Sequence, residues 1–74
     1  MTIEQVQKAY RATPFKPFTL NLADGRSVTV RHPEFMMMTP GGRTVVVATG
    51  DDSVEIIDLL LVTSLSTGNG TIGS

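Results

Sequence analysis

Hydrophobic and polar residues alternate most regularly between residues 18 and 31, and this alternation predicts a β-hairpin. Apolar side chains occupy every second position from Phe18 to Leu22, and the same period of two returns at Val28 and Val30. A period of two is typical of strands that bury one face. The Ala-Asp-Gly sequence between the two runs marks the turn.

The length of this turn decides which side chains share a face. A two-residue Asp-Gly loop would place the two apolar sets on opposite faces of the hairpin. A three-residue loop pairs Leu22 with Arg26 and Leu20 with Val28, so that both sets face the same side. The pattern therefore favours a type I turn with a G1 bulge, in which Gly25 is left-handed.

A short helix is predicted over residues 2–12, before the hairpin. Thr2 and Gln5 have the spacing of a capping box, and apolar residues recur every three or four positions behind them. Pro14 then disfavours helix and begins a stiff, extended connector over residues 13–18, whose phenylalanines are expected to pack on the end of a sheet.

Shorter segments follow the hairpin. The sequence predicts a strand over 34–38 beyond a bend at Pro33, and then a turn over 39–42. Residues 43–49 are predicted to form a strand with both faces covered, followed by a turn over 50–53. Two strands are predicted within 54–66, where they meet near Asp58 and Leu59, and a flexible tail follows over 67–74.

These elements define one fold class. We expect a mainly β domain over residues 1–66 with one N-terminal helix, built as a small, strongly bent five-stranded antiparallel barrel or open sheet. Residues 67–74 are expected to lie outside this domain as a flexible tail.

Size and composition indicate how such a domain could be stabilised. The chain has 74 residues and no cysteine. Domains this small usually need disulfides, a metal or oligomerisation. Because disulfides and thiolate metal sites are excluded, we expect a homo-oligomer. The absence of cysteine also fits a cytoplasmic protein.

Charge and hydropathy exclude other classes of partner. The formal net charge of −1 provides no general attraction to nucleic acid. No stretch approaches the roughly 18 apolar residues of a membrane span, and the N-terminus lacks the apolar core of a signal peptide. We therefore expect a cytoplasmic chain with no membrane partner and no evident small-molecule substrate.

The histidine and its neighbours form the first candidate site. His32 and Glu34 would share a face on a regular strand, as a metal site or an acid–base pair requires. Pro33 bends the chain between them, and two ligands are too few for structural zinc. We interpret Arg31 and His32 as polar residues at a strand bend that are open to a partner, and we expect no metal and no cofactor.

Two further motifs favour structural roles. Methionines 36–38 could ligate a soft metal through their thioethers, but methionine is also common in cores and at adaptable interfaces, which we favour here. Asp51 and Asp52 lack the alternating oxygen ligands of a calcium loop. Since no nucleophile and base stand in a catalytic pattern, we expect that the chain is not an enzyme.

Residues 18–65 resemble the Sm-like proteins, which include the bacterial RNA chaperone group. The resemblance rests on a helix followed by five strands and on a glycine turn before a bent strand, with matching positions at Leu22, Asp24, Gly25, Arg26, Val28 and Phe35. It implies a small barrel that assembles into rings. Val30 and Met36 replace the family's glycine and aspartate, Asp58 and Leu59 stand where its second motif would lie, and its base-pocket asparagine has no equivalent. The family's RNA-binding residues are therefore not carried over.

The segment PFKPFTLNLADGRSVTVRHPEF, residues 14–35, resembles a group of short, uncharacterised bacterial proteins. They share the PF-x-PF pattern, the DGR hairpin and the RHPEF sequence. The group has no established activity, so the resemblance implies no catalytic residues.

The sequence thus predicts a non-catalytic interaction or scaffold module that self-associates through strand edges and the apolar stretch 54–65. The alternative is a ring-forming, RNA-binding protein of the Sm-like type. Arg31, His32 and Arg43 are the candidate contacts with a partner or with RNA. RNA binding through these residues would weaken steeply with salt.

Overall fold

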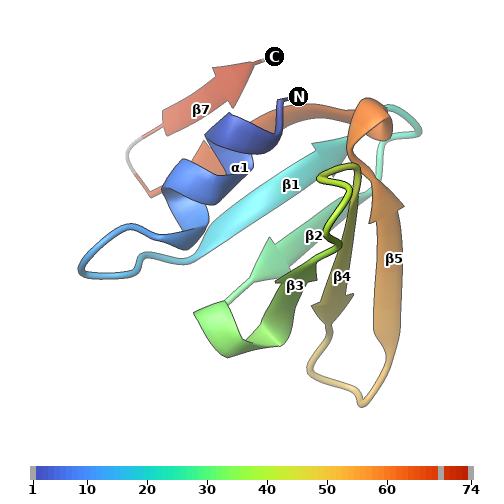
Figure 1. The fold of residues 1–74 in the computed structure, drawn as a ribbon, viewed down its shortest axis with the longest axis horizontal. Helices are drawn as coiled ribbons and strands as arrows, with labels where there is room; N and C mark the ends of the chain where they lie inside the picture. Colours follow the sequence, from blue (N-terminus) through green and yellow to red (C-terminus); the bar gives the residue numbers. More distant parts are fainter. Residues whose placement is uncertain (1, 69, 74) are drawn as a thin grey trace.

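Two antiparallel sheets enclose one core in this computed structural model, which describes residues 2–68 and 70–73 (Figure 1). The four-stranded sheet has the order β2-β1-β6-β7, and the three-stranded sheet has the order β3-β4-β5. The strands are β1 (Phe18–Leu22), β2 (Ser27–Val30), β3 (Met36–Met38), β4 (Thr44–Ala48), β5 (Val54–Asp58), β6 (Val62–Thr67) and β7 (Gly70–Gly73).

A short helix, α1 (Ile3–Tyr10), precedes the sheets and buries Val6 completely. The side-chain oxygen of Gln5 accepts hydrogen bonds from the backbone N–H of Thr2 at 3.2 Å and from its hydroxyl at 3.1 Å. Gln5 thus supports the start of the helix, as the sequence predicted. Because a helix this short is unstable alone, its docking on the sheet through Val6 holds it in place.

The β1–β2 hairpin has the predicted register. Leu20 pairs with Val28 and Phe18 with Val30, while the N–H of Leu22 donates to the carbonyl of Arg26 at 2.8 Å. Gly25 has a φ of 92°, in the left-handed region that favours glycine. The side chains of Phe18, Leu20 and Leu22 therefore point into the core.

The chain crosses from one sheet to the other at the predicted bend. A turn of 3-10 helix, η1 (Pro33–Phe35), separates β2 from β3. Strand β2 pairs with β1, and β3 pairs with β4, so residues 27–38 belong to both sheets. Met36 is buried and Met37 is exposed, which confirms the alternation predicted for the methionines.

The apolar stretch 54–66 forms two strands, as predicted. A second 3-10 turn, η2 (Leu59–Leu61), joins β5 to β6. The carboxylate of Asp58 accepts the N–H of Leu60 at 2.9 Å and thereby caps this turn. The bend sends β6 back to pair with β1 in the four-stranded sheet.

The inward side chains of both sheets and of α1 form a single core. Its buried members are Val6, Phe18, Leu20, Leu22, Val28, Val30, Met36, Val45, Val47, Ile57, Leu59, Val62 and Leu65. Phe15, in the connector, is partly buried, and its ring centroid lies 5.9 Å from that of Phe18. The expectation that both phenylalanines pack on the sheet is confirmed.

The coarse fold class is confirmed as mainly β with one N-terminal helix. In residues 2–68 and 70–73 the strands form two separate hydrogen-bonded sheets, so a closed five-stranded barrel is not confirmed. Strand β7 was not predicted. It lies within the expected tail of residues 67–74 and pairs with β6, while residues 69 and 74 lie outside the described residues.

One expectation about β4 is not met within the single chain. The sequence predicted a strand with both faces covered, because valines fill the middle of residues 43–49. Val45 and Val47 are fully buried, but Val46 is only half-buried and Ala48 is exposed. The described part of the chain covers just one face of β4.

Replacement of Gly25 with alanine tests the hairpin turn. The added Cβ would meet no atom, but a φ of 92° is unfavourable for an L-residue. We expect Gly25→Ala to lower the free energy of unfolding by about 1 kcal/mol, measured by urea denaturation. Gly41→Ala is the matched control, because Gly41 also faces open space and lacks a positive φ. Equal effects of the two substitutions would contradict this account.

Candidate functional site

The two sheets differ sharply in the chemistry of their outer faces. On the four-stranded sheet, β1, β2 and β6 direct polar side chains outward. The amide nitrogen of Asn21 donates to the hydroxyls of Ser64 and Ser66 at 2.9 Å, and its oxygen accepts the hydroxyl of Ser27 at 3.0 Å. This face forms a hydrogen-bonded polar surface that is suited to water.

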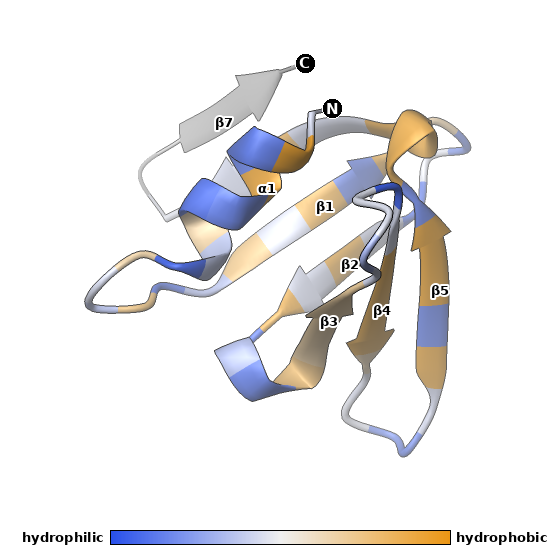
Figure 2. Ribbon diagram, viewed as in Figure 1, coloured by the Kyte–Doolittle hydropathy of each residue, from blue (hydrophilic) through white to orange (hydrophobic). Residues whose placement is uncertain are grey.

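The outer face of the three-stranded sheet is apolar. Met37 pairs with Val46, and Val46 pairs with Ile56, so these side chains form one row across β3, β4 and β5. Val54 lies two positions from Ile56 on the same face. We name these four residues, Met37, Val46, Val54 and Ile56, the outer apolar surface. Figure 2 shows how strongly hydrophobic residues predominate in these strands.

Exposure confirms that this surface is open within the described chain. Ile56 is 72% exposed, and Met37 and Val54 are each 59% exposed. Single exposed apolar residues are ordinary, but a contiguous apolar patch marks a contact surface. The outer apolar surface is therefore the strongest candidate site in residues 2–68.

Strand β5 adds an open edge to this surface. It is the last strand in the order β3-β4-β5, and within the described residues no strand pairs with its other side (Figure 1). Leu60 and Leu61 continue the exposed apolar residues beyond the end of β5. The edge and the apolar side chains thus occur on the same strand.

The structure separates the candidate contacts that the sequence predicted. Arg31 and His32 are exposed directly after β2, and the His32 ring meets the Phe35 ring edge-on at a centroid distance of 5.2 Å. Arg43 lies before β4, and its Nε is 3.8 Å from a carboxylate oxygen of Asp58. The three residues do not form one site.

Arg31 and Arg43 lie near opposite ends of β4. Arg31 lines a hollow of about 240 Å³ together with Phe35, Ala48 and Thr49, at the C-terminal end of β4. Arg43 stands at the N-terminal end of the same strand. Five residues of extended chain span roughly 16 Å. A ligand of moderate size would therefore contact one arginine and not the other.

No metal centre is formed by the side chains of residues 2–68, in which no three His, Asp or Glu residues gather as ligands. His32 contacts Phe35, and Glu34 lies on the same 3-10 turn as this phenylalanine. The bend at Pro33 thus interrupts the strand on which His32 and Glu34 would have shared a face.

Arg26 links the hairpin turn to β5. Its Nε lies 2.9 Å from Asp24 and its Nη1 lies 3.5 Å from Glu55. The backbone N–H and then the guanidinium of Arg26 donate to Asp24 and hold the pKa of this carboxyl below its usual value, while Asp24 and Glu55 raise the pKa of Arg26. Because these groups are exposed, water and salt screen the pairs, and their contribution to stability is small.

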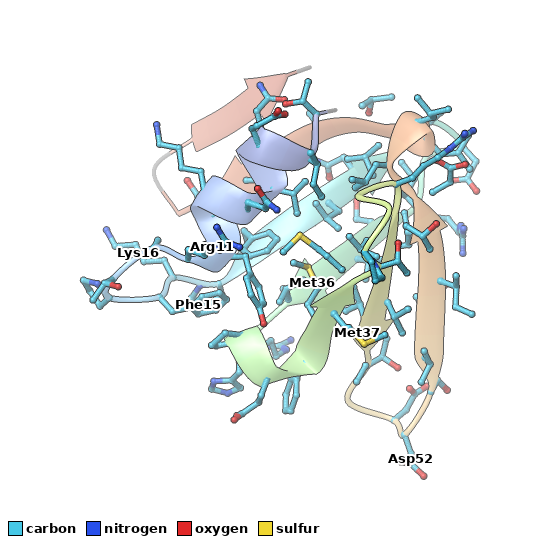
Figure 3. The ribbon with its side chains drawn as sticks, viewed as in Figure 1. Arg11, Phe15, Lys16, Met36, Met37 and Asp52 are labelled. Carbon is cyan, nitrogen blue, oxygen red and sulfur yellow. The ribbon has the colours of Figure 1, made fainter. Side chains whose placement is uncertain are left out.

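The β4–β5 turn presents an acidic tip. Asp52 has a φ of 69° and lies at the end of the loop (Figure 3). Hydrogen bonds from the hydroxyl of Thr49, and then from the side chain and backbone of Ser53, lower the pKa of Asp51. Asp51 therefore stays ionised down to a lower pH than an ordinary aspartate. The expectation of a polar hairpin turn is confirmed.

Sequence reasoning identified only part of the outer apolar surface: it assigned self-association to the stretch 54–65, which contains Val54 and Ile56, but it did not include Val46 or recognise the row across three strands. The signal was present, because residues 44–48 and 54–57 carry apolar side chains at both odd and even positions. A run of this kind indicates that both faces of a strand are covered. It does not state whether the same chain or another molecule covers the second face.

Comparisons of the chain with protein-family models, curated proteins and solved structures find no match. Among the residues that the structure describes, no helix is long and apolar enough to cross a membrane. The surface chemistry of the chain itself therefore carries the functional argument.

The acidic turn yields a prediction about pH. Thr49→Val removes the hydroxyl that donates to Asp51, so we expect the pKa of Asp51 to rise toward 3.8. Since this pKa is depressed in the folded state, its stabilising contribution is present above the unfolded value and is lost as pH falls through the folded value. Carboxyl titration by NMR measures the shift. Thr29→Val, on the other sheet, should leave the Asp51 pKa unchanged, and an equal shift in both variants would contradict the assignment.

Proposed function

We propose that this chain is a non-catalytic interaction or scaffold module that acts as a homo-oligomer. The supporting observation is the contrast between the outer faces, one polar and hydrogen-bonded, the other carrying Met37, Val46, Val54 and Ile56. Water solvates the polar face well. The outer apolar surface gains free energy when a partner covers it.

A second copy of the chain is the partner that requires the fewest assumptions. A chain of this size buries little apolar surface by itself, and oligomerisation is the stabilising device that remains without disulfides. An apolar strand edge left open would also promote uncontrolled aggregation. Defined self-association gives the edge a partner and brings exposed apolar side chains of two copies into contact. We include a cytoplasmic location in this proposal, because the chain lacks cysteine.

Replacement of Ile56 tests self-association. Threonine keeps the β-branched shape but removes apolar area from the most exposed member of the outer apolar surface. Each subunit loses roughly 1 kcal/mol or more of burial, so we expect Ile56→Thr to raise the dissociation constant at least tenfold. Sedimentation equilibrium measures this constant.

Thr29→Ser is the matched control for Ile56→Thr. Thr29 is also an exposed strand residue, but it lies on the polar outer face, where its hydroxyl contacts that of Thr19 at 2.9 Å. We expect the dissociation constant of the Thr29→Ser variant to equal that of the unmodified chain. If Ile56→Thr had no effect, the outer apolar surface would not be the interface.

RNA binding of the Sm-like type, in a ring of small barrels, is the alternative proposal. It draws support from Arg31, His32 and Phe35, which place a cation and two aromatic rings together on the exposed bend after β2. Guanidinium groups and aromatic rings stack on unpaired bases. Arg43 lies too far away to join the same contact.

Arg31→Ala should therefore weaken binding of a single-stranded oligonucleotide and reduce its salt dependence by about one unit of log–log slope. Arg43→Ala is the matched control and should retain full affinity. Fluorescence anisotropy with labelled oligouridylate measures both. Undetectable or salt-insensitive binding by the unmodified chain would eliminate the RNA proposal.

A further inference from the structure

We propose that β5 pairs with β5 of a second copy of this chain, antiparallel and centred on Ile56, so that two three-stranded sheets become one. The inference rests on the proposed self-association and specifies its geometry. It makes the interface a strand edge, supported by backbone hydrogen bonds.

The hydrogen-bond pattern shows which backbone groups of β5 are available. The N–H of Thr49 donates to Ser53 at 2.9 Å, and the N–H of Leu59 donates to Arg43 at 2.8 Å. Hydrogen-bonded and non-hydrogen-bonded pairs alternate along an antiparallel ladder. With the observed register, Glu55 and Ile57 therefore bond to β4. The N–H and C=O groups of Val54 and Ile56 and the N–H of Asp58 point to the open edge, whereas the carbonyl of Asp58, the N-cap residue, accepts the first hydrogen bond of η2.

This edge has few of the features that usually prevent strand pairing, the main one being Glu55, a charged residue on the same face as the buried Val47. Proteins protect open edges with lysine, proline or β-bulges. The register of β5 against β4 is regular from Val54 to Asp58, and the strand contains neither lysine nor proline. At the other end of the molecule, β7 covers the outer edge of β6. Pairing with β7 thus moves the edge of the four-stranded sheet from β6 to β7, whereas β5 remains an edge of the three-stranded sheet and is available for pairing.

Centring the pair on Ile56 gives the greatest overlap of the two strands. Ile56 then faces Ile56 of the second copy, and Val54 faces Asp58 of the second copy. The two Ile56 residues then exchange two hydrogen bonds, and at each end the carbonyl of Val54 accepts the N–H of Asp58 of the second copy. Ile56, the most exposed side chain of the outer apolar surface, then lies beside its own counterpart, and the outer apolar surfaces of the two copies join on one face of the combined sheet.

The charged turn before β5 favours an antiparallel pair over a parallel one. Asp51 and Asp52 lie in this turn, whereas at the other end of β5 the side chain of Asp58 lies 3.8 Å from that of Arg43, so these two charges balance each other. Antiparallel pairing keeps the acidic turns of the two copies at opposite ends of the paired strands. Parallel pairing would instead bring the two acidic turns together.

Single cysteines test the register, because the natural chain contains no cysteine. In the proposed dimer the two Ile56 Cα atoms lie about 5.5 Å apart, within disulfide range. We expect Ile56→Cys to form a disulfide-linked dimer under mild oxidation at least tenfold faster than two control variants. The first control is Val54→Cys, whose sulfurs in the two copies would lie roughly 14 Å apart along the strand. The second is Met37→Cys, which lies on β3, at the opposite edge of the sheet from the proposed interface.

The pattern of cross-links separates the outcomes. Equal or faster linkage of Val54→Cys would indicate a shifted register, and that of Met37→Cys would indicate face-to-face packing. Either result would overturn the proposed β5 pairing but not self-association. The same holds if the protein is a dimer that none of the three cysteine variants cross-links. A monomeric unmodified chain would overturn self-association itself.

Amide hydrogen exchange on the unmodified chain provides a second measurement that needs no substitution. The N–H of Ile56 has no acceptor on β4 in the observed ladder, so it should exchange quickly in dilute solution and at least tenfold more slowly at high concentration. The N–H of Ile57 bonds to β4 and is the internal control, since its protection does not require a second copy. Fast exchange of Ile56 in the associated protein would contradict β5 pairing.

Discussion

The architecture depends on the sharing of one bent strand by two sheets. Residues 27–38 pair with β1 before the bend and with β4 after it, and Pro33 stands at the crossing. This bend directs the inward side chains of both sheets into one core, beneath Val6 of the helix. In so short a chain, the apolar residues within the core and their close packing provide the main stabilising free energy.

A single core cannot cover four sheet faces. The four-stranded sheet resolves this on its outer side with threonine, serine and Asn21, whose hydrogen bonds link β1, β2 and β6. The three-stranded sheet carries apolar side chains on its outer side as well. This difference between two sheets of the same molecule has no explanation in the packing of the described chain. The proposed contact with a second copy would account for it.

Local patterns predicted the local structure well. The alternation from Phe18 to Val30 and the Ala-Asp-Gly turn determined the hairpin register, because neighbouring residues decide a tight turn. The break near Asp58 was also recognised, since the apolar stretch has no uniform period.

Longer-range features could not be predicted in the same way. Strand β7 depends on pairing with β6 and has a composition of small and polar residues that resembles a tail. The distance between Arg31 and Arg43 follows from the path of β4 and not from either residue's neighbours. The valines of β4 indicated that both faces of this strand are apolar, but only the fold showed which of the two faces is exposed in the single chain.

The solution mass of the unmodified chain, measured by light scattering on a sizing column at two protein concentrations, tests the central claim most directly. The account predicts a mass that is a defined multiple of 7.9 kDa at the higher concentration. A mass of one chain at both concentrations would contradict it, because the open edge of β5 and the apolar side chains beside it would then have no second copy as a partner.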